Sequence, residues 1–451
     1  MKHRAAQTLS VCLIVKNEEQ LLGDCLESIR GIADQLVILD TGSTDRTLEI
    51  AQSYQAELHH FAWSNDFSAA RNESIKYATG DWILWIDADE RLVPDSIESL
   101  KRLLRFEAKP VIYKVRIKNI KEDGANYTLS DAHRLFTNHR RIKFSGRIHE
   151  QISPSAKQVG AQERDCPVVL DHLGYGFTGA DKANKQTRNR DLLEAQVQEN
   201  PNSAYAHFTL AHNYKVDENL SGAEQHYLKA IELQQFDSSM EATLLNSYAD
   251  TLLDLGRTEE APAWVERSLK LHRMQNAAYF LKYRIAMASK KYDDAEVALK
   301  TIQSNQEHIQ HSGSDISTDL EISSLVIWKT LGDLHVKMEK WSEAAGAYSA
   351  GLKESENSVE LLKDLFKVQE KVGDWSAALE VLGKLVTIEG ELPAYINAIA
   401  AILIRMEAFE AALQTYLRLN QLQPGDAGTR RKIAALYAKL GQVENAREWL
   451  S

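Results

Sequence analysis

The sequence predicts an α/β domain over residues 1–183 and an all-α repeat region over residues 184–451 of a 451-residue chain. In the first part, apolar runs typical of buried strands alternate with segments of helical periodicity. In the second part, helix-patterned segments recur at a constant spacing of 34 residues. Because alternating strands and helices form a mainly parallel sheet covered on both faces, we expect ligands to bind beyond the carboxyl ends of the strands.

The strands of the first domain are predicted from nearly continuous apolar runs. Residues 9–15 read Leu-Ser-Val-Cys-Leu-Ile-Val, as expected of a strand that is buried on both faces. Residues 18–30 follow with apolar side chains at helical spacing. The same criteria predict strands over residues 36–39, 82–86 and 111–117 and a helix over residues 44–54.

The second region is predicted to be a tetratricopeptide-type solenoid. A small residue is needed where the two helices of a pair approach closely, and alanines recur here at the 34-residue period of that repeat. They are Ala344, Ala378, Ala412 and Ala446, preceded by Ala261 and Ala295 at the same step. About 15 extra residues separate the two series, and we expect the Ser-, His- and Gln-rich residues 306–318 to form a surface loop.

The composition excludes some classes of function. The formal net charge is −11, whereas a general nucleic-acid binder needs surplus Lys and Arg, so no nucleic-acid partner is expected. The first apolar run is too short to cross a bilayer, so no membrane span is expected. Three cysteines without a metal-binding spacing favour a reducing compartment, and we expect a cytoplasmic protein.

Polar clusters follow the predicted strands. Asp87 and Asp89 are separated by one residue directly after a buried strand, and such a pair can bind a hard divalent cation, Mn²⁺ or Mg²⁺. That cation would stabilise the negative charge that develops on a departing diphosphate. The other clusters span residues 15–19, 40–45, 67–72 and 144–150.

In order and spacing, these clusters resemble the family 2 glycosyltransferases, inverting enzymes with the GT-A fold, over roughly residues 8–180. The resemblance is closest to members that join this domain to tetratricopeptide repeats, some of which glycosylate peptides. It implies a nucleoside-diphosphate sugar as donor, with a UDP-sugar favoured, and Asp89 as the main metal ligand. It places Asp87 at the ribose and Asp40 at the base. The remaining implied nucleotide-sugar contacts are Val15, Glu18, Arg71 and Ala88.

An inverting transfer also needs a base that removes the acceptor proton on the face opposite the leaving group. By its position in the domain and by the resemblance, Glu150 is our choice, with Asp131 and Asp171 as rivals. His172 and His149 are candidate metal ligands, although a lone histidine is more often a buried, hydrogen-bonded residue.

Two further features have open interpretations. For Arg71 the alternative to a nucleotide contact is an ordinary surface ion pair. The basic stretch around His133 and Arg134, which continues through residues 139–143, is either a contact for a diphosphate or an anionic acceptor, or a solvated hairpin.

Three functions compete. The first is an active glycosyltransferase whose repeats hold a protein or peptide acceptor, with a glycan or lipid-glycan acceptor as the alternative. The second is an inactive nucleotide-sugar-binding scaffold, in which the repeats serve assembly, including homo-oligomers. The third, a sugar nucleotidyltransferase, would need a glycine-rich basic loop after the first strand, which residues 16–19 do not supply. Because the donor motifs lie upstream of Gly179, a chain ending there is expected to keep donor binding.

Overall fold

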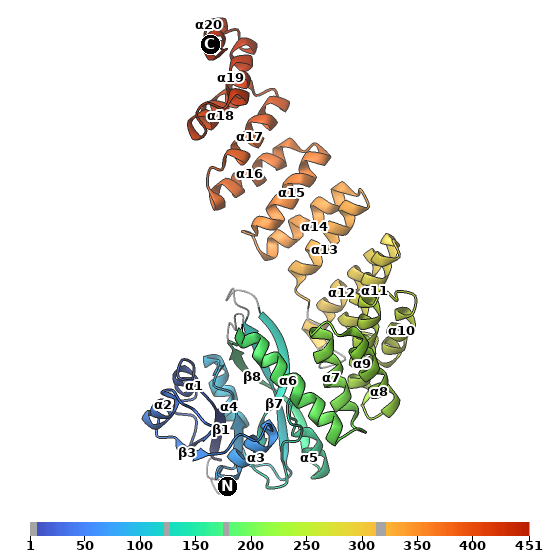
Figure 1. Ribbon diagram of the computed structural model, residues 1–451. Helices are drawn as coiled ribbons and strands as arrows, with labels where there is room; N and C mark the ends of the chain where they lie inside the picture. The colour runs from blue at the N-terminus through green and yellow to red at the C-terminus, as the bar shows by residue number, and fades with distance from the viewer. Residues whose placement is uncertain (1–6, 121–126, 175–179, 313–321, 451) are drawn as a thin grey trace. The chain divides into compact units, whose positions relative to one another are not determined.

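The computed structural model describes residues 7–120, 127–174, 180–312 and 322–450 (Figure 1). Of these described residues, those up to residue 274 form one compact unit, and residues 275–312 and 322–450 form another. In the part that is described, the first unit contains the α/β domain followed by five helices, and the second consists of further helices. Within the described residues, no helix combines the length and the apolar character needed to cross a membrane.

The α/β domain is built on one eight-stranded sheet with the order β3-β2-β1-β4-β7-β6-β8-β5. The first four strands pair in parallel, β7 runs antiparallel to both of its neighbours, and β6 and β8 are parallel. The sheet is therefore mixed, and it is parallel mainly at the end that carries β1. The strands are β1 (Leu9–Val15), β2 (Gln35–Asp40), β3 (Glu57–His60), β4 (Trp82–Trp85), β5 (Glu90–Leu92), β6 (Val111–Ile120), β7 (Tyr127–Thr137) and β8 (Gln162–His172).

Helices cover both faces of this sheet, as the alternating pattern predicts. Alternate side chains of β1 enter different cores: Leu13 packs with residues of α1, α2 and α4, whereas Cys12 packs with Ile83 and with residues of the α3 and α5 side. A strand with both faces covered needs apolar residues at successive positions, which explains the run over residues 9–15. The helices are α1 (Leu22–Ser28), α2 (Thr47–Ser53), α3 (Phe67–Lys76), α4 (Ile97–Leu103), preceded by a 3₁₀ turn at Pro94–Ser96, and α5 (Ser153–Gln158).

The first helices of the repeat region belong to the same compact unit as the sheet. Leu192 and Leu193 of α6 form an apolar cluster with Ile148 of the α/β domain and Leu210 of α7. Both leucines are buried, so this contact stabilises the position of α6 against the domain. The helices of this unit are α6 (Ala180–Glu199), α7 (Ala204–Val216), α8 (Leu220–Leu233), α9 (Ser238–Asp254) and α10 (Ala261–Leu271).

The second unit continues as helix pairs. They are α11 (Asn276–Ala288) with α12 (Tyr292–Ser312), α13 (Ser324–Lys337) with α14 (Trp341–Glu354), α15 (Val359–Val372) with α16 (Trp375–Glu389), α17 (Pro393–Arg405) with α18 (Phe409–Leu422), and α19 (Ala427–Lys439) with α20 (Val443–Leu450). Each predicted alanine is buried in the second helix of its pair, which confirms the 34-residue repeat.

Three expectations need correction or stay open. The loop predicted over residues 306–318 is wrong for its first part, because α12 extends to Ser312; residues 313–318 lie outside the described residues. Strands β3, β5, β7 and β8 were absent from the sequence-based assignment, since they are short or partly exposed and lack a continuous apolar run. The domain boundary predicted between residues 183 and 184 falls inside α6 and stays a prediction.

Candidate active site

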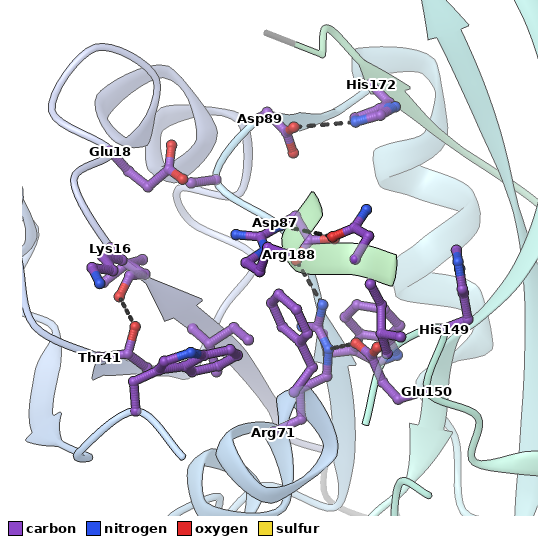
Figure 2. Close-up of a pocket in the computed structure, with 18 residues that line it drawn as sticks. Lys16, Glu18, Thr41, Arg71, Asp87, Asp89, His149, Glu150, His172 and Arg188 are labelled. Atoms are coloured by element: carbon purple, nitrogen blue, oxygen red, sulfur yellow. Dashed lines mark hydrogen bonds and ion pairs between the residues drawn. The ribbon is translucent and has the colours of Figure 1, made fainter. Parts of the chain in front are cut away.

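A pocket of about 700 Å³ lies at the carboxyl ends of β1 and β4 (Figure 2). That volume lies within the range of small-molecule sites, and the location is the one that the sheet topology predicts. Its wall comes from the ends of the two strands, the start of α3, residues 148–150, His172 at the end of β8, and two residues of α6. Of the predicted site residues, Val15, Glu18, Arg71, Asp87, Ala88, Asp89, His149, Glu150 and His172 line it.

Asp89 and His172 lie side by side at one end of the pocket (Figure 2). The Nε2 atom of His172 is 3.1 Å from Oδ2 of Asp89, and Nδ1 is 2.8 Å from Oδ1 of Asn119. An amide oxygen only accepts hydrogen bonds, so Nδ1 donates to Asn119, and Nε2 is the ring atom that faces Asp89. The hydrogen bond to Asp89 is the main cause of a raised pKa for His172, against the opposing effect of burial.

This pair fits a divalent cation in part. A carboxylate oxygen and a neutral imidazole nitrogen suit Mn²⁺, and a carboxylate suits Mg²⁺. The described part of the chain contains no group of three or more His, Cys, Asp or Glu side chains that could hold a metal ion. The remaining ligands would therefore have to come from substrate phosphates and water, as is usual for Mg²⁺ in phosphate-binding sites. The structure does not bring His149 to this pair, since it lies on the Glu150 side of the pocket (Figure 2).

Arg71 connects the two acidic sides of the pocket. Its Nη2 donates to Oδ1 of Asp87 at 2.9 Å, and its Nε donates to the carboxylate of Glu150. The guanidinium carbon lies 3.8 Å from the ring centroid of Trp85, a cation–π distance. Although burial opposes the charge, Asp87 and Glu150 outweigh it and raise the pKa of Arg71. Arg71 is therefore a buried bridge between carboxylates, and its predicted contact with the nucleotide stays a prediction.

A second arginine, Arg134 of β7, belongs to the basic stretch for which the sequence left two interpretations open. Its Nη2 donates to Oδ2 of Asp87 at 3.2 Å and to Oε1 of Glu90 at 2.5 Å, and its guanidinium carbon lies 3.4 Å from the Trp85 centroid. Because Arg134 is buried, the solvated-hairpin alternative is wrong for it.

The two acids beside these arginines have pKa values that are shifted in opposite directions. Burial would raise the pKa of Asp87, but Arg71 and Arg134 outweigh it and hold that pKa well below its usual range. Burial dominates at Glu90 and raises its pKa to about 7 despite the contact with Arg134. Asp87 is therefore an ionised carboxylate with a fixed orientation, as a preorganised polar site requires.

Asp40 ends β2 but is not among the pocket-lining residues; its neighbour Thr41 is. The Asp40 carboxylate is buried and accepts hydrogen bonds from the backbone N–H groups of Gly42 at 3.2 Å and Ser43 at 2.9 Å. Burial, which would raise its pKa, is outweighed by hydrogen bonds from Ser43, Gly42 and His60, so the pKa is lowered. The structure thus shows Asp40 organising its own loop, and its role in reading the base stays a prediction.

Glu150 and His149 lie together on the opposite side of the pocket from Asp89 (Figure 2). His149 has a φ of 53°, an unusual conformation for a non-glycine residue, and its carbonyl accepts a hydrogen bond from the Tyr205 hydroxyl at 3.3 Å. Burial lowers the pKa of His149. The rival bases are outside the lining: Asp131 pairs with Arg116, and Asp171 lies 4.0 Å from Lys118.

Other lining residues lay outside the predicted set. Lys16 and Phe67 stood in the polar clusters but were given no role, and Trp63 and Trp85 carried no signal for this site. Arg188 and Asn189 come from α6, so a chain ending at Gly179 would lack two residues that line this pocket. The sequence of α6 alone does not indicate that its residues line this pocket, because only the packing of α6 on the domain brings them to it.

Comparison with known proteins gives the following similarities. Residues 10–160 match the family model described as glycosyl transferase family 2. A TPR repeat-containing protein of Synechococcus elongatus is 29% identical over 306 residues, 66% of this chain and 66% of the relative. The glycosyltransferase SunS of Bacillus subtilis is 29% identical over 199 residues, 43% of this chain and 46% of SunS.

Two further proteins are similar to parts of the chain of different length. The lipopolysaccharide core biosynthesis glycosyltransferase LpsC of Rhizobium meliloti is 30% identical over 178 residues, 36% of this chain and 65% of LpsC. The structure of a tetratricopeptide repeat protein from Parabacteroides merdae covers 55% of this chain and 90% of its own, with 12% identity and a TM-score of 0.35. The chain spans about two thirds or less of the length of these curated relatives.

Proposed function

We propose that this chain, whose residues 10–160 match the family 2 glycosyltransferase model, is an inverting glycosyltransferase that uses a nucleoside-diphosphate sugar, with a UDP-sugar favoured. The acceptor in this proposal is a protein or peptide held by the repeats. One observation carries the proposal: a single pocket holds the Asp89–His172 pair at one end and Glu150 at the other. A donor diphosphate and an attacking acceptor need these two kinds of groups on opposite sides of the reacting carbon.

On the donor side, Val15, Glu18 and Ala88 line the part of the pocket where the nucleotide would bind. Asp87 faces the same space with its orientation held by two arginines, so it can accept a ribose hydroxyl without a cost of reorganisation. A Mn²⁺ or Mg²⁺ ion on Asp89 and His172 would supply charge stabilisation for the departing diphosphate.

On the acceptor side, Glu150 would take the proton from the acceptor hydroxyl. In the same displacement, the acceptor oxygen bonds to the anomeric carbon, and the bond from that carbon to the diphosphate oxygen breaks. The nucleoside diphosphate leaves, and the configuration inverts. The ion pair with Arg71 fixes the orientation of the Glu150 carboxylate. Neither Asp131 nor Asp171 lines the pocket, which favours Glu150 over both.

The placement of the first repeat helices supports a macromolecular acceptor. Tyr205 of α7 contacts the carbonyl of His149, next to the proposed base. Arrays of helix pairs commonly present extended binding surfaces to proteins and peptides. An acceptor chain that lies along the first repeat would therefore begin beside Glu150.

The test is a screen of UDP-, GDP- and TDP-sugars with the full chain, in Mn²⁺ and in excess EDTA. We expect one donor to bind and to be slowly hydrolysed without acceptor, with turnover that requires the metal. With an acceptor, NMR of the product should show the anomeric configuration opposite to that of the donor. Binding of a donor without hydrolysis or transfer would favour the inactive nucleotide-sugar-binding scaffold, and absence of both binding and hydrolysis for all donors would refute the proposed function. Full turnover in EDTA would refute the requirement for a divalent metal ion.

A further inference from the structure

Acidic side chains outnumber permanently cationic ones in the lining of the pocket. Its lining contains four carboxylates and three permanently cationic side chains, namely Glu18, Asp87, Asp89 and Glu150 against Lys16, Arg71 and Arg188. Arg71 already donates to Asp87 and Glu150, so its charge is compensated within the protein. A nucleoside diphosphate adds further negative charge to this space, and its binding requires a cation that is not already paired.

Arg188 of α6 meets this requirement. Among the described residues, its guanidinium hydrogen-bonds with the amide oxygen of the adjacent Asn189, at 3.2 Å, and has no carboxylate partner. Its guanidinium carbon lies 5.5 Å from the ring centroid of Phe67, another pocket residue. Surrounding protein atoms lower the pKa of Arg188, as expected for a cation that lacks a compensating acid. Figure 2 shows the side chain among the residues that line the pocket.

The position of α6 against the domain is held by contacts close to Arg188. Leu192 and Leu193 pack against Ile148, two residues from Glu150. The backbone N–H of Arg147 donates to the side-chain oxygen of Gln196 at 2.7 Å, and Gln196 is itself buried. These contacts hold α6 against the domain within about two turns of helix beyond Arg188.

We infer that Arg188 binds the diphosphate of the donor, so that the first helix after the α/β domain completes the nucleotide-sugar site. A guanidinium can donate two parallel hydrogen bonds to phosphate oxygens, which a lysine cannot do. In the transfer, this contact strengthens as charge builds on the departing diphosphate. The inference rests on the proposed function, since it needs a nucleoside diphosphate in the pocket.

The test is calorimetric titration of the full chain with UDP, GDP and TDP in Mn²⁺, followed by NMR titration with the nucleoside of the base that binds most tightly. Arg188→Ala should weaken the binding of the diphosphate by about 10- to 100-fold and leave the affinity for the nucleoside unchanged. Arg188→Lys should give an intermediate loss. The matched control is Arg190→Ala on the same helix, because Arg190 faces Asp217 at 3.5 Å and does not line the pocket.

The possible outcomes distinguish a failure of this inference from a failure of the proposed function on which it rests. If the wild-type chain binds none of the three diphosphates, the proposed function fails and Arg188 has no diphosphate to hold. If the wild type binds one and Arg188→Ala binds it equally well, the inference alone is wrong. An equal loss of affinity for the diphosphate and for the nucleoside would also overturn it, because loss of a phosphate contact cannot weaken the binding of a ligand that has no phosphate. Coincident thermal melting curves of the variants and the wild type establish that the fold is retained.

Discussion

Two guanidinium groups organise the acids of the pocket. Arg71 and Arg134 both contact the ring of Trp85 and both donate to Asp87, which leaves that carboxylate with one orientation. Removing one partner from such a buried set leaves a charge without compensation, typically at a cost of about 3–5 kcal/mol. The neighbouring Asp89 has no arginine partner among the described residues and instead faces His172. This difference separates an orienting carboxylate from one that is available to a cation.

The first prediction concerns Asp89. Asp89→Ala should lower sugar transfer by at least about 10²-fold, because the charge that stabilises the departing diphosphate is no longer held. Steady-state rates across a Mn²⁺ titration measure this effect. Asp131→Ala serves as the control, since Asp131 pairs with Arg116 outside the pocket. If Asp89→Ala transfers at the wild-type rate, the metal site lies elsewhere.

The second prediction concerns Glu150. Glu150→Gln keeps the size of the side chain but cannot accept a proton, so turnover should fall by about 10²- to 10⁴-fold with little change in nucleotide affinity. Single-turnover kinetics and nucleotide titration separate these two effects. Asp131→Asn and Asp171→Asn should remain close to the wild type. A dead variant at either of those aspartates, beside an active Glu150→Gln, would show that another carboxylate is the base.

At the scale of helices, the repeat depends on close approach within each pair. The predicted alanines are buried, and a glycine plays the same part on α13: a Cβ added to Gly332 would lie 2.5 Å from Cδ1 of the Tyr348 ring. Tyr348 is buried on α14, and its hydroxyl donates to Asp333 at 2.7 Å. The ring therefore cannot move aside without losing both its packing and this hydrogen bond.

The third prediction follows from this contact. Gly332→Ala should reduce the free energy of unfolding by about 1–3 kcal/mol through overpacking, although Ala normally favours a helix over Gly by about 1 kcal/mol. Urea denaturation followed by circular dichroism measures the change. Gly346→Ala on α14 is the matched control, because no atom lies within 4 Å of the added Cβ, and it should be neutral or stabilising. Equal effects at both glycines would refute the packing argument.

The fourth prediction concerns the acid sensitivity of a contact between repeats. Glu296 of α12 accepts hydrogen bonds from Lys300 at 2.5 Å and from Lys340 at 2.9 Å and lies 3.4 Å from Nε2 of His335. The hydrogen bonds from Lys300 and Lys340 lower the pKa of Glu296 to about 2. A carboxylate with a depressed pKa in the folded state contributes stability above its unfolded pKa, and that contribution is lost as the pH falls through the folded pKa.

Wild-type stability should therefore decline between about pH 4.5 and pH 2 more steeply than that of Glu296→Gln. At neutral pH the variant should be less stable by about 1–2 kcal/mol, a value reduced for screening by solvent. Chemical denaturation at a series of pH values measures both effects. Glu380→Gln is the control, since its pair with Lys384 is exposed. Parallel pH profiles for the wild type and Glu296→Gln would contradict the assignment.

At the scale of the whole chain, the compact units suggest where the protein can be divided. A chain ending at Gly179 lacks Leu192 and Leu193, which cover Ile148, and it lacks Arg188 of the pocket. A chain ending at Met274 keeps these residues together with all the described residues of the first compact unit.

The fifth prediction compares these two truncations. The chain of residues 1–274 should bind and slowly hydrolyse the donor like the full chain, whereas the chain of residues 1–179 should bind it at least about 10-fold more weakly or fail to fold. Both should lose transfer to a macromolecular acceptor, because the tethering surface is shortened or removed. Donor titration and acceptor assays measure these effects. If the chain of residues 1–274 modifies the acceptor as fast as the full chain, the later repeats are not the acceptor site.

Local sequence determined those features whose physical cause is local. A strand covered on both faces needs consecutive apolar residues, so β1 and β4 were predictable from their own residues. Helix pairs that pack closely need small residues at a fixed spacing, so the repeat was predictable as well. The edge strands β3 and β5 were not, because an edge position with partly exposed side chains imposes no such pattern.

The acids of the pocket were predictable because they follow predicted strands, but their partners were not. Glu150 lies 79 residues from Arg71, and His172 lies 83 residues from Asp89. The contact between Arg134 and Asp87 spans 47 residues, and Arg188 comes from a helix outside the region that the family resemblance covers. Only the tertiary structure decides these neighbours, because the register of the sheet and the packing of α6 bring them together, and neither leaves a periodic signal in the chain.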